Sequence, residues 1–325
     1  MNWKNFKIIV IVLLLILNIF IAFMLKDTYE STAFLSSDLI LQSAANLETK
    51  GLYIKPSAIE KKIPEMYVYS YEQNIRYSNE SYENYQKDYP FIQKLFSGIV
   101  QKNKKYEPNF FSIPSGISIS VNEKNSDVPL GVISFTNDFD IEYINSEFSS
   151  ENIDGYIAYD IFSAGNEDIP KNDEKIVKKF FTSLYGKVGA GKYYKILGAQ
   201  NSPCGLVISC AMKIDGYEVC DKILNFCISD GKIMYIKGSW CFLPHEKSYD
   251  CDLIDGVNIL YKTEKENITV LSEKMAYLSI KYENGKYLVI PTWILKYTYA
   301  GGDAINCLVD AVIGETHSEI LAASE

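Results

Sequence analysis

The longest apolar run of the chain stands near its N-terminus, where residues Ile8 to Leu25 read IIVIVLLLILNIFIAFML. The run contains no charged residue, and Asn18 is its one strongly polar member. As a helix it measures about 27 Å at roughly 1.5 Å per residue, which nearly matches a hydrocarbon core of about 30 Å. The pattern therefore predicts a transmembrane helix over residues 8–25, after a cytoplasmic stub of residues 1–7.

Charges around this run predict the direction in which it crosses. Lys4 and Lys7 precede it, whereas Asp27 and Glu30 follow closely after Lys26. By the positive-inside rule, the N-terminus lies in the cytoplasm. A cleaved signal peptide is the alternative, but its apolar region spans only about 7–15 residues. We therefore expect a single-pass protein of the cell membrane, with an uncleaved signal-anchor and the bulk of the chain extracytoplasmic.

After residue 25 the pattern alternates between helical and strand-like periods. Apolar residues at helical spacing, among them Leu35, Leu39 and Leu47, predict an amphipathic helix over residues 29–50. Alternating apolar and polar residues, and runs of β-branched and aromatic residues, predict strands further on. These strands are residues 66–71, the hairpin formed by 116–123 and 131–138, and residues 155–162.

A polar, acidic stretch at residues 166–173, NEDIPKND, separates this part from the rest of the chain. It predicts a boundary between two extracytoplasmic subdomains, residues 26–165 and residues 166–325. The second subdomain opens with a helix whose apolar face includes Phe180 and Phe181.

Two Asp-Gly pairs in this second part mark hairpin turns between apolar runs. They are Asp215-Gly216 and Asp230-Gly231, and they predict a three-stranded antiparallel meander. A short helix from Leu253 and a second meander complete the chain. The predicted fold class is therefore α+β, with an N-terminal transmembrane helix followed by two helix-plus-antiparallel-sheet subdomains.

Composition narrows the classes of function. Acidic residues number 41 against 32 basic ones, so the net charge is −9 and nucleic acid is a poor partner. The 25 tyrosines and 16 phenylalanines favour sheet. Only two histidines, His245 and His317, are present, which sharply limits histidine-based catalysis or metal binding. We expect neither a metal site nor a cofactor site.

All seven cysteines lie from Cys204 onward, and none stands in a Cys-x-x-Cys pattern. Free cysteines commonly pack as small buried apolar residues, and this is one interpretation of the set. The Asp-Gly hairpins provide another, because they place Cys204 opposite Cys227 and Cys220 opposite Cys241. An oxidising exterior would permit these two disulfides.

Pairs of carboxylates raise the alternative of an exported hydrolase. They are Asp138 with Asp140 and Asp250 with Asp252, each pair on one face of an extended strand. Two carboxylates do not make a catalytic site without a pocket and shifted pKa values. The chain also has neither Gly-x-Ser-x-Gly nor His-Glu-x-x-His. We therefore expect no catalytic residues and no enzymatic activity.

The opening residues, MNWKNFKIIVIVLLLILNIFIAFML, resemble the start of the YycI family, whose members begin with M-x-W-x-x-x-K and a single span ending in LNIF or similar. Later segments are similar to the related YycI/YycH group. These segments are the connector GLYIKPSAIEKKIPEM, the hairpin Asp230-Gly231-Lys232, the strand with Pro291-x-Trp293, and the closing DAVIGE.

This resemblance implies a non-enzymatic, membrane-anchored regulatory protein with PepSY-like extracytoplasmic modules. Its partners would be a sensor histidine kinase of the WalK (YycG) type and a YycH-like protein, in a two-component system that controls cell-wall metabolism in Gram-positive bacteria. Asn18 is then the best candidate for a contact between membrane helices, because an amide in hydrocarbon seeks a polar partner. The alternative is an exported binding module for a peptide or a cell-wall fragment, with the Tyr-rich segment 72–90 lining a groove.

Overall fold

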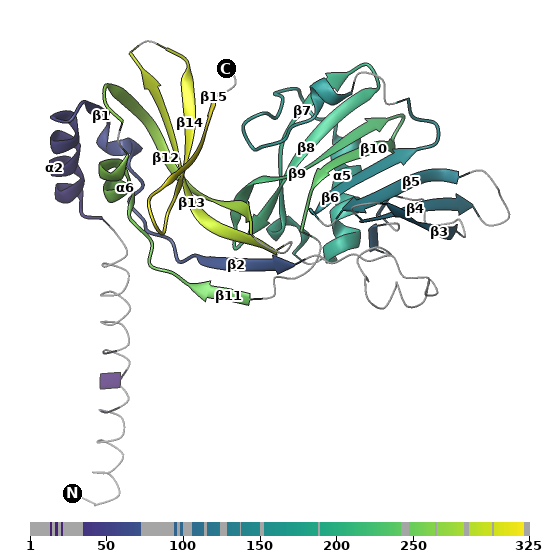
Figure 1. Cartoon of the computed structure of the whole chain (residues 1–325), viewed down its shortest axis with the longest axis horizontal. Coiled ribbons are helices and arrows are strands. Elements are labelled where there is room, and N and C mark those ends of the chain that lie inside the picture. Colours follow the sequence, from purple (N-terminus) through teal and green to yellow (C-terminus); the bar gives the residue numbers. More distant parts are fainter. Residues whose placement is uncertain are drawn as a thin grey trace, which may run out of the picture.

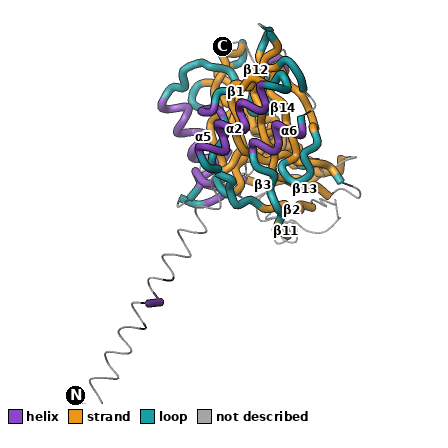
Figure 2. Tube along the Cα trace, turned by 90° about the vertical axis from the view of Figure 1, so that its left-hand side faces the viewer, coloured by secondary structure: helices purple, strands orange, loops and turns teal. Residues whose placement is uncertain are grey.

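Strands make up most of the body of the protein, as the two views in Figures 1 and 2 show. The computed structural model describes residues 14, 17, 18, 21, 35–72, 94, 95, 98, 99, 106–113, 116–123, 129–136, 138–149, 153–187, 189–241, 247–263, 265–282, 286–300 and 302–321. Within these ranges the strands follow one another in a single curled sheet, with three α-helices packed beside it. The segments 73–93 and 242–246, which hold the Tyr-rich segment and His245, lie outside the described residues.

The N-terminal part corrects one prediction. Among the described residues, no helix is both long and apolar enough to cross a bilayer. The longest described helix, α5, has 15 residues and carries a charged face. By this finding the predicted transmembrane helix and the single-pass membrane location are wrong. Most of residues 8–25 lies outside the described residues, and the four that are described, Leu14, Leu17, Asn18 and Ile21, are helical and exposed.

Two short helices pack together at one side of the sheet. Helix α2 (Ser37–Glu48) begins at Ser36, whose side chain accepts a hydrogen bond from Leu39 N at 3.2 Å. Helix α6 (Gly256–Lys262) begins at Asp255, which caps it in the same way. Their buried apolar residues are Ile40, Ala44, Leu47, Val257, Ile259 and Leu260. Leu39, which the pattern also places on the apolar face, is exposed. Both predicted helices are confirmed within the described residues.

The first half-sheet runs in the order β7-β8-β9-β10-β6-β5-β4-β3 and is antiparallel throughout. Its strands are β3 (Tyr106–Ile113), β4 (Gly116–Glu123), β5 (Pro129–Thr136), β6 (Asp140–Asn145), β7 (Tyr194–Ser202), β8 (Gly205–Ile214), β9 (Tyr217–Ser229) and β10 (Lys232–Ser239). The predicted β8–β9–β10 meander is confirmed. Its turn residues Asp215 and Asp230 both have φ of 50°, as a hairpin turn of this kind requires.

Two different elements cover the two faces of the first half-sheet. Helix α5 (Lys171–Tyr185) packs Phe180 and Phe181 against Phe226, with ring centroids 4.9 and 5.7 Å from it. The opposite face is covered by the segment of residues 153–166, which we call the strap. Here the sequence predicted a strand at 155–162. That prediction is wrong, since the strap is a 3-10 turn (Asp154–Tyr156) followed by irregular chain.

The second half-sheet runs in the order β11-β2-β13-β12, with β14 and β15 continuing from β13 and β1 pairing with β12. Its strands are β1 (Leu52–Ile54), β2 (Tyr67–Glu72), β11 (Lys247–Asp250), β12 (Ile268–Lys281), β13 (Lys286–Tyr299), β14 (Ala304–Asp310) and β15 (Thr316–Leu321). The predicted meander of β12, β13 and β14 is confirmed, and β15 extends it. In Figure 1, β2 and β11 run along the lower edge of this half.

These pairings correct the predicted fold class. The described part of the chain is mostly β, and its strands share one sheet instead of forming two separate helix-plus-sheet subdomains. Strands on either side of residue 166 pair with each other, because β2 joins β13 and β6 joins β10. In the predicted fold class, each subdomain forms its sheet from its own stretch of sequence. The pairs β2–β13 and β6–β10 contradict that arrangement.

Candidate functional site

The two half-sheets meet at a narrow seam between β9 and β12. These strands run parallel, and Val219 and Tyr277 are the one residue pair in their register. Beyond this pair the strands diverge, and a cavity of about 430 Å³ opens beside them. We call it the central cleft. Its lining comes from the strap, β7, β9, β12, β13 and β14, and it consists of Ile161, Phe162, Ala164, Asn166, Lys195, Leu197, Glu218, Ser272, Lys274, Ile294, Lys296 and Asn306.

The central cleft is basic although the chain as a whole is acidic. Three lysines line it, Lys195, Lys274 and Lys296, against the single carboxylate of Glu218. The ammonium groups of Lys195 and Lys274 both pair with Glu218, the second at 3.7 Å. Burial raises the pKa of Glu218, but the hydrogen bond from Lys195 and the charge of Lys274 outweigh it and the pKa falls below its usual value. Glu218 is therefore ionised at neutral pH and holds two lysines at the cleft.

An apolar floor and one buried amide complete the central cleft. Ile294 packs with Cys220, Ala276 and Leu308 in a buried cluster beneath it. Asn306, opposite Lys296 in the β13–β14 register, is only 5% exposed. Within the described ranges, no hydrogen bond to its side-chain amide is found. Buried amides almost always have a partner, so Asn306 offers a donor and an acceptor to an occupant of the cleft.

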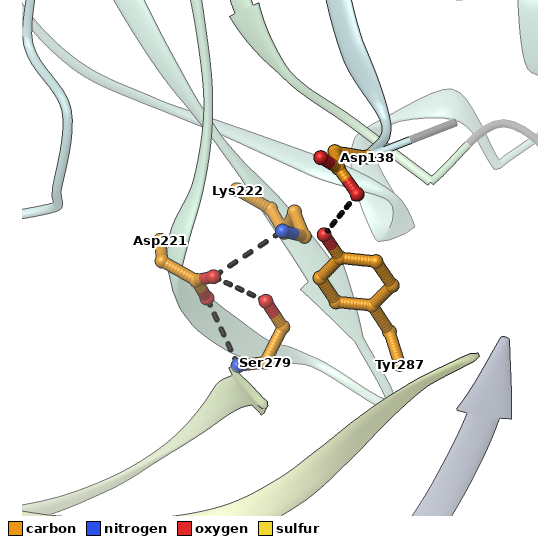
Figure 3. A network of polar contacts seen from close by, with 5 residues as sticks. All are labelled: Asp138, Asp221, Lys222, Ser279 and Tyr287. Atoms are coloured by element: carbon orange, nitrogen blue, oxygen red, sulfur yellow. Dashed lines mark hydrogen bonds and ion pairs between the residues drawn. The ribbon is translucent and has the colours of Figure 1, made fainter. Parts of the chain in front are cut away.

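A polar network closes the seam beyond the Val219–Tyr277 pair (Figure 3). The carboxylate of Asp221 accepts hydrogen bonds from the backbone N–H of Ser279 at 3.0 Å and from the Ser279 hydroxyl. It thereby replaces a backbone hydrogen bond between the diverging strands. The Lys222 ammonium, on a residue only 3% exposed, lies 3.2 Å from this carboxylate and 5.1 Å from the centroid of the Tyr287 ring.

A second cavity, of about 550 Å³, lies on the other side of the strap. It is acidic, with Asp140, Glu142 and Asp221 against Lys237. Burial raises the pKa of Asp140, and a hydrogen bond with Thr136 partly offsets this. The other two carboxylates are engaged, since Glu142 accepts a hydrogen bond from Tyr235 at 2.6 Å and Asp221 belongs to the seam.

The strap forms a wall of both cavities and is held by one buried amide. Asn225 accepts a hydrogen bond from Ala158 N at 3.0 Å and one from Ser209 Oγ at 2.7 Å. Its own N–H groups donate to the carbonyls of Ala158 and Lys237 at 2.8 and 3.1 Å. The side chain of Asn225 thus pairs with the backbone of Ala158 as a neighbouring strand would.

We expect Asn225→Leu to loosen the strap. The change leaves the N–H and C=O of Ala158 without partners, at a cost of about 1–3 kcal/mol. Amide hydrogen exchange at Ala158 should then accelerate by about tenfold or more, because local opening becomes easier. Replacing the exposed Asn201 by alanine is the matched control. Unchanged exchange at Ala158 in the leucine variant would contradict this role.

The structure separates the carboxylates that the sequence placed in pairs. Asp138 binds Lys281 at 2.6 Å and the Tyr287 hydroxyl at 3.0 Å, and the hydrogen bond from Lys281 lowers its pKa. Asp140 instead faces the acidic cavity. In the second pair, Asp250 is the last residue of β11 and Asp252 follows two residues later. Both side chains are exposed. Neither pair lies in the central cleft.

All seven cysteines are free thiols in the structure. Cys204 and Cys227 are neighbours, because the Cys227 thiol lies 3.5 Å from the Cys204 carbonyl oxygen. Cys220 and Cys241 lie in separate apolar clusters. Burial raises the pKa of Cys227 to about 11 and that of Cys241 to about 12. The disulfides stay a prediction, and Cys204 with Cys227 is the pair whose placement favours one.

Comparisons with known proteins give the fold a weak context. No protein-family model matches the chain, and no curated protein matches it. The structure is similar to the Bacillus megaterium YpeB C-terminal domain, at 11% identity and a TM-score of 0.43, over 76% of this chain and 100% of that one. It is also similar to the crystal structure of an uncharacterized protein from Eubacterium rectale ATCC 33656, at 12% identity and a TM-score of 0.41, over 82% of this chain and 91% of that one.

Sequence reasoning missed every charged residue of the central cleft. Lys296 and Asn306 stand inside strands that are otherwise mostly apolar, whereas Lys274 follows two polar residues in β12. A polar residue in such a strand is the one local signal that points to a site. The signal does not show that these residues meet, since they come from three strands, and Glu218 comes from a fourth.

Proposed function

We propose that the protein is a non-enzymatic regulatory protein that binds a partner in the central cleft. The observation that carries this proposal is the set of recognition groups there, which comprises lysines around one ionised carboxylate, an apolar floor, and the buried amide of Asn306. Ligand sites are commonly concave and apolar, with a few polar groups that converge on the ligand. The central cleft has this composition.

The groups that would serve catalysis support the same proposal. Burial raises the pKa of the thiols of Cys210, Cys220 and Cys241, which disfavours the nucleophilic thiolate. His317 lies 3.5 Å from Asp310, and that carboxylate already accepts hydrogen bonds from the backbone of the following turn. These side chains have structural roles in the described part of the chain.

The partner in this proposal follows the sequence resemblance. It is a sensor histidine kinase of the WalK type, acting together with a YycH-like protein, and the outcome is a change in kinase activity. The alternative, a binding module for a cell-wall fragment, would use the same cleft. The basic lining suits an anionic group on a protein partner, and we therefore favour the kinase complex.

Co-purification of the full chain with the kinase from cells that produce both tests this proposal. We expect Lys274→Glu to reduce the captured kinase by about fivefold or more, because the charge of a half-exposed cleft residue is reversed. Lys178→Glu is the control, since Lys178 is equally exposed but lies on α5 beside Glu174. Equal capture by the wild type and by Lys274→Glu would contradict the proposal.

A further inference from the structure

We propose that the occupant of the central cleft is an extended peptide that places a carboxylate beside an apolar side chain. The inference rests on the proposed function, because it takes the same cleft as the binding site, and it adds the chemistry of the ligand. Three features of the described residues carry it: the charge of the lining, the unpartnered amide of Asn306, and an available strand edge.

Charge comes first. Lys195, Lys274 and Lys296 converge on a cleft in which Glu218 is the one opposing carboxylate. Lys195 and Lys274 share that carboxylate, so their ammonium groups still have hydrogen-bond donors to offer to a second anion. Lysine binds anions as a compact point charge. A carboxylate entering between Lys195 and Lys274 would accept hydrogen bonds from the donors that Glu218 does not use.

The buried amide adds directionality to this charge. Asn306 lines the cleft opposite Lys296 in the β13–β14 register, and only 5% of its surface is exposed. Its N–H groups can donate to a carboxylate, and its oxygen can accept from a peptide N–H. An apolar side chain two residues along an extended ligand would reach the surface formed by Leu197 and Ile294.

The wall formed by β7 explains why an extended ligand fits. β7 pairs with β8 along one edge. In the described part of the chain, its other edge carries a single isolated bridge, between Ala199 and Asn166. Lys195 and Leu197 line the cleft from the same strand. The end of the strap occupies this edge at Ala199, where the Glu167 N–H also donates to the Ala199 carbonyl at 2.9 Å. A peptide added along the remaining part of the edge, at residues 194–197, gains backbone hydrogen bonds while its alternate side chains reach the cleft.

The acidic cavity on the other side of the strap differs from the central cleft in the sign of its charge. Asp140, Glu142 and Asp221 line it, so it repels the same ligand. The two cavities are similar in size, about 430 and 550 Å³. Charge, and not available volume, therefore selects the central cleft for an acidic peptide.

Binding of the purified full chain to an array of synthetic ten-residue peptides tests the inference. The array holds peptides that repeat Glu-Ser-Val-Ser, so that glutamate and valine lie two residues apart on one face of the extended chain, together with versions in which glutamine or lysine replaces the glutamate. We expect glutamate peptides to bind about tenfold more tightly than glutamine peptides, because charge-assisted hydrogen bonds are lost with the carboxylate, and lysine peptides not to bind. Equal binding of the three series, or binding by none, would overturn the inference.

Two variants locate the binding site. We expect Asn306→Leu to weaken binding of the glutamate peptides by about tenfold. The variant should still fold, since leucine is close to asparagine in size and favours a buried position, and its thermal unfolding midpoint checks this. Lys274→Gln should weaken binding about threefold, and Lys178→Gln should leave it unchanged. Unaltered binding by a folded Asn306→Leu protein would overturn the assignment to this cleft.

The outcome separates this inference from the proposed function. Loss of kinase capture in Lys274→Glu without any preference for glutamate peptides would leave the proposed function standing and overturn the inference. Selective peptide binding without kinase capture would support the inference and contradict the proposed partner. Displacement of the bound peptide by millimolar inorganic phosphate, at the potency of free glutamate peptide, would overturn the assignment to a peptide.

Discussion

Replacement of Asp221 by alanine is expected to lower the free energy of unfolding by about 3–5 kcal/mol, because it removes the carboxylate that pairs directly with a buried ammonium. Lys222 is 3% exposed, and Asp221 is the carboxylate with which it pairs, at 3.2 Å. The same change removes the two hydrogen bonds from Ser279 that continue the seam between β9 and β12. Urea denaturation of the wild type and the variant measures the loss.

Lys222→Met separates the charge effect from the loss of the seam. Methionine fills the buried space without a charge, while Asp221 keeps its hydrogen bonds from Ser279 and is one-third exposed to water. We expect a change within about 1.5 kcal/mol. The double variant should recover part of the stability that Asp221→Ala loses. If Lys222→Met destabilises the protein as much as Asp221→Ala does, the unpaired charge of Lys222 is not the cause of the loss of stability in Asp221→Ala.

The second large effect concerns a carboxylate buried between β12 and α6. Glu273 is 6% exposed, and one of its oxygens accepts a hydrogen bond from the backbone N–H of Glu60 at 3.1 Å. Its other oxygen is buried without a partner among the described residues. Burial raises the pKa of Glu273 to about 8, and the charge of Asp255 adds to the shift.

The sign of the resulting pH dependence follows from that shift. In the folded state Glu273 holds its proton up to a pH of about 8, whereas its usual value is 4.5. The contribution of Glu273 to the free energy of unfolding is therefore fully present below a pH of about 4.5 and is lost as the pH rises through about 8. Each unit of pH within this window costs up to about 1.4 kcal/mol.

Glu273→Gln is expected to flatten this dependence, because glutamine resembles the protonated carboxyl group. At pH 9 we expect the variant to be more stable than the wild type by about 2–4 kcal/mol, and at pH 5 to be close to it. Urea denaturation at pH 5, 7 and 9 measures the difference. Glu266→Gln, at an exposed position nearby, is the control. Parallel curves for the wild type and Glu273→Gln would show that ionisation of Glu273 does not govern stability.

Local signals in the sequence predicted local structure well. The Asp-Gly turns at Asp215 and Asp230 follow from the backbone conformation that such turns need, and the structure has φ of 50° at both aspartates. The apolar face of α5 follows from helical spacing, and Phe180 and Phe181 are fully buried as it predicts. Turn chemistry and helical period act over a few residues, so one sequence is enough to show them.

Features that depend on distant partners were not predictable in the same way. The strap has the composition of a strand, but Asn225 satisfies its backbone at Ala158, and no local pattern shows that an amide 67 residues away will do so. The central cleft likewise joins β7, β9, β12 and β14. Its residues read as isolated polar positions until the sheet brings Glu218 and Asn306 to the same space.

The prediction made from the apolar run at the N-terminus is one that the structure corrects. Run length predicted a transmembrane helix at residues 8–25, and no described helix meets the length and apolarity that a span requires.

The pairing of β2 also determines the order in which this chain can fold on the ribosome. β2 is complete by residue 72, but its partners β11 and β13 begin at residues 247 and 286. Its tyrosine-rich edge therefore remains exposed during most of translation, when unpaired strands readily associate with other nascent chains. β2 therefore reaches its place in the sheet only after the C-terminal third of the chain has emerged.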